Sequence, residues 1–145
     1  MRKLTLLLAF FSAILLGGCS LLEGVNDSLE YANAAKDHIN NLTNFGEQAP
    51  QLIQDAATNP EIKQDLENQL TTLKAEIEEF NNVEPPTIAE DLHQQLVSKN
   101  EAIVDAIDKA MVNGELALDK LENTELLNTI NEITNMLNQI EKLGS

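Results

Sequence analysis

The sequence predicts an all-α fold, an antiparallel bundle of about four amphipathic helices that follows a signal peptide. Apolar residues recur at every third or fourth position over four stretches of the chain, which is the spacing of one helix face. Short breaks containing asparagine, proline or glycine separate these stretches, and no segment combines strand alternation with turn chemistry. Amphipathic helices joined by short connections pack best as an antiparallel bundle.

The first predicted helix begins at Asn26 or Asp27, either of which is a suitable N-cap. Phe45 and Gly46 are expected to end it, and a shorter, weaker helical stretch follows over about 50–57. Its apolar face consists of Leu29, Ala32, Ala35, Ile39 and Leu42.

The second predicted helix has a clear start at Asn59-Pro60-Glu61. This sequence supplies a cap, a proline at the first helical position and an acid at the positive end of the helix dipole. The helix is expected to stop near 81–82, before a stiff break over 83–86 that contains two prolines. Its apolar face consists of Ile62, Leu66, Leu70, Leu73, Ile77 and Phe80.

The third predicted helix starts with a capping box, in which Thr87 is followed three residues later by Glu90. Gly114 is a suitable C-terminal stop, and residues from about 115 to 121 are expected to add one or two further turns. The apolar face consists of Ile88, Leu92, Leu96, Ile103, Ile107 and Met111.

The last predicted helix begins at 123–125 and closes at 143–144, with Lys142 at the negative end of the dipole. Its apolar residues alternate steps of four and three, which is the heptad rhythm of packed helices. They are Leu126, Ile130, Ile133, Leu137 and Ile140.

The N-terminal segment has the organisation of an export signal. Residues 1–3 carry two positive charges, and residues 4–16 form an apolar run broken only by Thr5 and Ser12. This run is too short to span a bilayer comfortably and has the length of a signal-peptide core.

The end of this segment, Leu16-Gly17-Gly18-Cys19, resembles the lipobox of bacterial lipoproteins. The resemblance implies Leu16 at the hydrophobic position, Gly17 and Gly18 at the small positions, and cleavage between Gly18 and Cys19. It also implies that Cys19, the only cysteine of the chain, accepts a lipid whose acyl chains, such as palmitate, anchor the protein. The alternatives are an ordinary secretory signal with a chance cysteine, or an uncleaved anchor helix.

The expected organisation is a signal peptide over 1–18, a lipidated tether over 19–25 and a helical bundle domain over 26–145. The domain is expected at the extracytoplasmic face of the cell membrane. About 127 residues remain after cleavage, which is a usual size for one domain without disulfides.

The charge disfavours several classes of partner. The chain has a net charge of −15, and the expected mature part carries seven lysines, no arginine and 24 acids, for a net charge of −17. Such a surface is unsuited to nucleic acid or to bidentate phosphate recognition, and it repels anionic lipid headgroups.

The two histidines are the candidate metal ligands of the chain. Glu90 and His93 have the Glu-x-x-His spacing of carboxylate-bridged metal bundles, but those bundles need a second such pair. Ala35 precedes His38 where the second glutamate would stand. The sequence therefore predicts no metal site and no cofactor, and His93 is expected at the surface or at its boundary.

Catalytic residues are also not recognised. The single cysteine is the predicted lipid site, and none of the serines lies in a Gly-x-Ser-x-Gly elbow. The chain is therefore expected not to be an enzyme.

Lys99 and Asn100 interrupt the apolar face of the third helix where an apolar residue is due. Two interpretations stay open. Either the face drifts and the pair is directed to water, or the pair forms a polar layer that fixes register or opens a small pocket.

The whole chain resembles a family of short lipoproteins from spore-forming Gram-positive bacteria that is known as a domain of unknown function. The resemblance implies a host with one membrane and supplies no catalytic residues. It rests on the segments Cys19–Glu23, Asn26–Tyr31, Glu79–Asn81, Asp91–Gln95 and Leu121–Glu125.

The function expected is that of a membrane-anchored, extracytoplasmic interaction or structural module of the cell envelope. Its expected partners are the membrane, through the lipid on Cys19, and an envelope protein or a second copy of the chain. The alternative is a binding module that holds a small apolar or cationic ligand between its helices.

Overall fold

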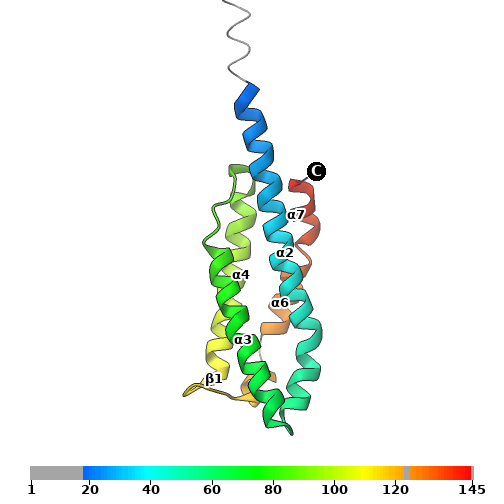
Figure 1. Ribbon diagram of the computed structural model, residues 1–145, viewed down its shortest axis with the longest axis vertical. Coiled ribbons are helices and arrows are strands. Elements are labelled where there is room, and N and C mark those ends of the chain that lie inside the picture. The colour runs from blue at the N-terminus through cyan, green and yellow to red at the C-terminus, as the bar shows by residue number, and fades with distance from the viewer. Residues whose placement is uncertain (1–17, 123–124, 145) are drawn as a thin grey trace, which may run out of the picture.

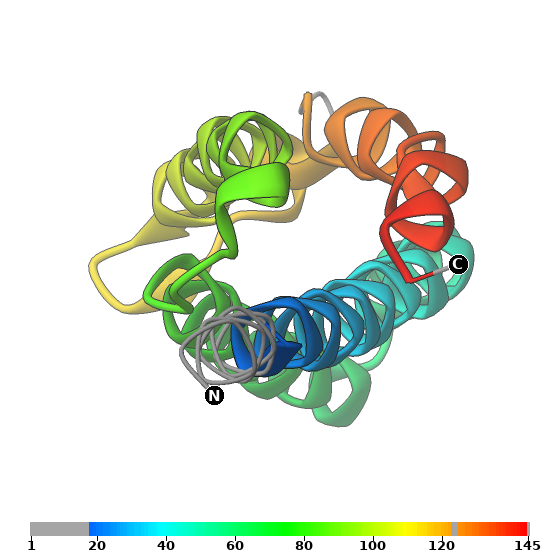
Figure 2. The same cartoon turned by 90° about the horizontal axis from the view of Figure 1, so that it is seen from above.

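The computed structural model describes residues 18–122 and 125–144, with side chains from residue 26 onward except that of Glu122. The predicted all-α class is confirmed. Four helical columns run up and down one long axis and follow one another around it in chain order (Figures 1 and 2). They are α2 (Gly18–Ala56), α3 (Pro60–Asn81), α4 (Glu90–Ala110) and the pair α6 (Leu126–Thr134) and α7 (Leu137–Leu143).

The first column, α2, is longer at both ends than the sequence predicts. Residues 19–25, expected as a tether, are helical, because no proline interrupts them and a helix propagates easily from a packed segment. The expected stop at Phe45 and Gly46 is wrong: Phe45 is buried, and the buried residues Ala49 and Ile53 continue the apolar face beyond it. Pro50, on the exposed side, lies within the helix.

The second column, α3, confirms the predicted start. The side chain of Asn59 accepts a hydrogen bond of 2.9 Å from the backbone N–H of Glu61, and Pro60 opens the helix. Five of the six predicted apolar positions are buried, and Ile62 is half-buried near the exposed first turn.

The predicted capping box at the third column is wrong. Thr87–Ala89 forms a short 3-10 helix, η1, and no side chain caps α4, which begins at Glu90. Pro86 has an extended backbone conformation, and its carbonyl accepts the N–H of Ala89 at 2.8 Å. Ile88 is consequently 71% exposed instead of buried.

A two-stranded hairpin follows α4, where a helix stop at Gly114 was expected. Strand β1 (Met111–Val112) pairs antiparallel with β2 (Glu115–Leu116), at the end of the bundle opposite the N-terminal end of α2 (Figure 1). Asn113 and Gly114 have φ values of 56° and 85°, the left-handed conformation that a tight hairpin turn requires. The short helix α5 (Leu118–Glu122) then leads into the last column.

The last column is broken between α6 and α7, where one continuous helix was expected. The hydroxyl of Thr134 lies 2.9 Å from the carbonyl of Ile130 and 2.8 Å from the hydroxyl of Thr43 on α2. Threonine hydroxyls that bond the preceding turn bend helices. Two backbone hydrogen bonds between residues three apart in the chain, which the carbonyls of Ile133 and Met136 accept, complete the break.

The core is mostly aliphatic and lies along the axis between the four columns. Every column contributes to its largest fully buried side chains. Among the apolar positions predicted from the sequence, Leu29 (46%) and Ile88 are exposed. None of the helices within 18–122 and 125–144 is long and apolar enough to cross a membrane.

Candidate functional site

Two hydrogen bonds cross the interior of the bundle between α2 and α4. The hydroxyl of Tyr31 lies 3.1 Å from Nδ1 of His93, and Nε2 of His38 lies 3.0 Å from Oδ1 of Asn100. Each pair is 62 residues apart, and the two pairs are seven residues apart on both helices. The two helices therefore run in the same direction, on opposite sides of the four-column ring.

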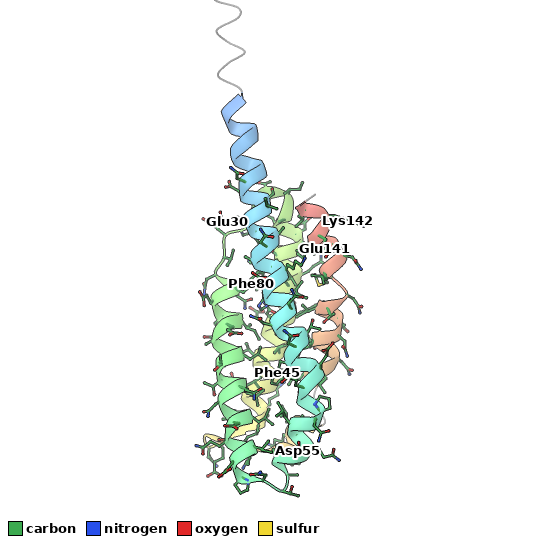
Figure 3. All side chains as sticks on the ribbon, turned by 45° about the vertical axis from the view of Figure 1, so that its right-hand side comes forward. Glu30, Phe45, Asp55, Phe80, Glu141 and Lys142 are labelled. Carbon is green, nitrogen blue, oxygen red and sulfur yellow. The ribbon has the colours of Figure 1, made fainter. Side chains whose placement is uncertain are left out.

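Phe80 fills the space between these two hydrogen bonds. Its ring stacks on His38 with a centroid distance of 4.1 Å and an interplanar angle of 0°. It is tilted against His93 at 5.5 Å and against Tyr31 at 6.4 Å. Figure 3 shows Phe80 beside α2, between Glu30 and Phe45 along the bundle.

The end of α3 completes the network through Asn81. Because a carboxamide oxygen only accepts, Nε2 of His38 donates to Asn100, and Nδ2 of Asn100 donates to Oδ1 of Asn81 at 2.7 Å. His93 also hydrogen-bonds the backbone of Asn81. We call this group the polar cluster; its members are Tyr31, His38, Phe80, Asn81, His93 and Asn100.

Both histidines of the polar cluster are neutral at physiological pH. Burial lowers the pKa of His38 below its ordinary value, against the opposing effect of the hydrogen bond to Asn100. Burial likewise lowers the pKa of His93, opposed by the hydrogen bond to the backbone of Asn81. Burial also raises the pKa of Tyr31 to about 12, so its hydroxyl keeps its proton at physiological pH.

The expectation that His93 lies at the surface or its boundary is wrong, because it is 7% exposed. Glu90, the other residue of the Glu-x-x-His spacing, is exposed, while His93 is buried and faces Tyr31. Within the part of the chain that the structure describes, no three acids, histidines or cysteines gather as a metal site would require.

Lys99 and Asn100, which the sequence left open as one pair, behave differently. Asn100 is fully buried and belongs to the polar cluster, as the polar-layer interpretation expects. Lys99 is partly exposed and pairs with Glu132 on α6. A signal for the cluster was present in the sequence: Tyr31 and His38, like His93 and Asn100, are seven residues apart.

The predicted lipid site lies at the start of the structure. Leu16 and Gly17 are outside the described residues, whereas Gly18 and Cys19 form the first turn of α2. Cys19 is therefore ten residues, or about 15 Å of helix, before Leu29. At the level of Leu29 the bundle begins, since a Cβ added to Gly144 would lie 3.4 Å from Cδ1 of Leu29.

Residues 31–143 match the model of a protein family that is described as a family of unknown function (DUF6376). The chain belongs to this family. The matched part of the DUF6376 chain contains the whole polar cluster, and the family agrees with the resemblance stated from the sequence.

The DUF6376 chain is also similar to a protein of Bacillus subtilis (strain 168). The two are 32% identical over 147 residues, which cover 99% of each chain, and the Bacillus protein is named uncharacterized lipoprotein YybP. No solved structure matches the DUF6376 chain.

Proposed function

We propose that this chain is a lipoprotein of the cell envelope, cut before Cys19, lipidated on that cysteine and held at the extracytoplasmic face of the membrane. Its bundle acts as a non-enzymatic interaction module. The leader and the lipobox pattern support this proposal, as does the similarity to a protein named as a lipoprotein.

One structural observation carries the proposal: the lipid-acceptor position belongs to the same helix as the core. Helix α2 is continuous from Gly18 to Ala56 and contacts α3, α6 and α7 along its length (Figure 1). A lipid on Cys19 therefore holds the bundle through about 15 Å of helix instead of a flexible linker. The sides and far end of the bundle are then presented at a defined distance from the membrane.

The alternative of a small ligand between the helices is less well supported. In the middle of the bundle, Phe80 stacks on His38 in the interior. His38 is hydrogen-bonded to Asn100, and His93 is hydrogen-bonded to Tyr31. A ligand there would displace a hydrogen-bonded, close-packed cluster.

Substitution of the acceptor cysteine tests the proposal. The variant Cys19→Ala removes the only thiol, so the chain should lose its lipid and appear in the medium or as the unprocessed precursor. Cell fractionation and mass spectrometry of the N-terminal peptide measure this, with Ser20→Ala as the matched control that keeps the acceptor. Unchanged membrane association and size of Cys19→Ala would refute the proposal.

A further inference from the structure

A continuous groove follows the seam between α2 and α3. It consists of three hollows of about 370, 340 and 510 Å³. The first and second hollows share Asn41 and Glu76, and the second and third share Ala34 and Val83. We call this surface the α2–α3 groove.

The groove is long enough for an extended chain. On α2 it reaches from Asp27 to Phe45, which is about 27 Å of helix and the length of about eight residues in extended conformation. The labelled residues Glu30, Phe80 and Phe45 follow one another along this side of the bundle in Figure 3.

Free carboxamides line the groove near the middle of the bundle. Asn41, Asn44, Asn68 and Gln69 come from both helices and are all exposed. None of them has a hydrogen bond to another described residue, although each offers a donor and an acceptor side by side. That pairing matches the N–H and C=O groups of a polypeptide backbone.

Acids line the other half, toward the N-terminal end of α2. Asp27, Glu30 and Glu84 surround one hollow, and Glu76 and Glu79 border the next. No lysine lines any of the three hollows among the described residues. The groove is thus complementary to a cationic occupant.

Two members of the polar cluster form part of the floor of the groove. His38 and Phe80 line the middle hollow. Since Nε2 of His38 donates to Asn100, its Nδ1 is an acceptor, and it has no hydrogen bond within the described residues. An N–H group of an occupant can donate a hydrogen bond to this Nδ1 atom, although His38 is only 7% exposed.

We infer that the α2–α3 groove binds an extended, lysine- or arginine-bearing segment of a partner polypeptide. The carboxamides hold the backbone of the segment and the acids hold its side chains. The inference rests on the proposed interaction function and names its partner, but it does not depend on the lipid, because the groove lies within residues 27–86.

Fluorescence anisotropy of a labelled peptide tests the inference on the full chain, purified from the producing cells in non-ionic detergent. The probe is an octapeptide of alternating lysine and alanine with blocked ends. The double variant Asn44→Ala, Asn68→Ala removes two carboxamides at exposed helix positions without deleting a hydrogen bond of the fold. It should weaken binding by at least about tenfold.

Two controls distinguish backbone recognition from charge attraction. The double variant Asn131→Ala, Asn138→Ala, at exposed positions of the last column, should leave binding unchanged. The same peptide with methylated backbone nitrogens keeps its charge and should bind at least about tenfold more weakly.

The inference would be overturned by no binding of the octapeptide, by equal binding of the methylated peptide, or by equal weakening of binding in both double variants. Tighter binding of a neutral sugar oligomer than of the peptide would also overturn it. Failure here leaves the lipid anchor intact, since that is measured by the fractionation of Cys19→Ala.

Discussion

Gly46 shows how a single residue determines the approach of two columns. It lies within α2, and a Cβ added there would stand 2.8 Å from Cγ2 of Ile130 on α6. Real side chains do not approach so closely. The glycine therefore serves the contact between α2 and α6, although glycine lowers the intrinsic stability of a helix.

We predict that Gly46→Ala destabilises the protein. Alanine gains up to about 1 kcal/mol of helix propensity, but overpacking costs about 1–3 kcal/mol. Urea unfolding followed by circular dichroism should show a net loss of about 1 kcal/mol or more. Ile130→Leu, which removes the β-branch, should restore part of the loss in the double variant. A more stable Gly46→Ala would contradict the contact.

At the scale of elements, Gly114 in the hairpin between α4 and α5 is required for its backbone conformation and not for its small size. Gly114 has a φ of 85°, and nothing lies within 4 Å of the place where a Cβ would stand. The N–H of Leu116 donates to Oε1 of Glu67 on α3 at 2.9 Å, which fixes the hairpin to the bundle.

We predict that Gly114→Ala lowers the free energy of unfolding by about 1 kcal/mol. An alanine in left-handed backbone is strained by about 1–2 kcal/mol. Part of this loss is offset because alanine reduces the conformational entropy of the unfolded chain. Gly114→Asn, which tolerates this conformation, should cost less. Thermal unfolding of the two variants measures the difference. Equal loss for both would show that the turn conformation is not the cause.

Elements whose signals are local could be predicted from the sequence. The start of α3 is an example, because Asn59 and Pro60 act within one turn. The continuation of α2 through Gly46 could not, since it depends on the contact with Ile130. The hairpin turn has the Asn-Gly sequence typical of such turns, at Asn113 and Gly114. From the sequence alone, however, a helix stop accounts for Gly114 equally well.

The polar cluster was predictable only in part. An interrupted apolar face pointed to Lys99 and Asn100, but which of the two is buried depends on the rotation of α4 by about 100° per residue. Nothing local to His38 or His93 indicates that each has a partner 62 residues away.

At the scale of the molecule, the two buried histidines link stability to pH. Their pKa values are lower in the folded state than in the unfolded state, where they are about 6.5. Below that pH the unfolded chain binds protons that the folded chain does not, so stability falls as the pH falls. Above about pH 10 stability falls again, because burial raises the pKa of Tyr31 to about 12.

We predict a decrease in unfolding free energy between pH 7.5 and 5.5, with a slope of up to about 1.4 kcal/mol per pH unit for each histidine. Urea titrations at a series of pH values measure it. The double variant His38→Gln, His93→Gln, which removes both imidazoles, is the reference. An identical slope in this variant would exclude the histidines as its source.

The continuity of α2 also determines how the molecule bears mechanical load. A pull on the N-terminal end of α2 acts along the axis of a 39-residue helix that contacts α3 on one side and the last column on the other (Figure 2). Such a force shears all of these contacts together, whereas a pull across the axis would peel them one by one. The bundle is thus built to resist traction from the end at which the lipid is proposed.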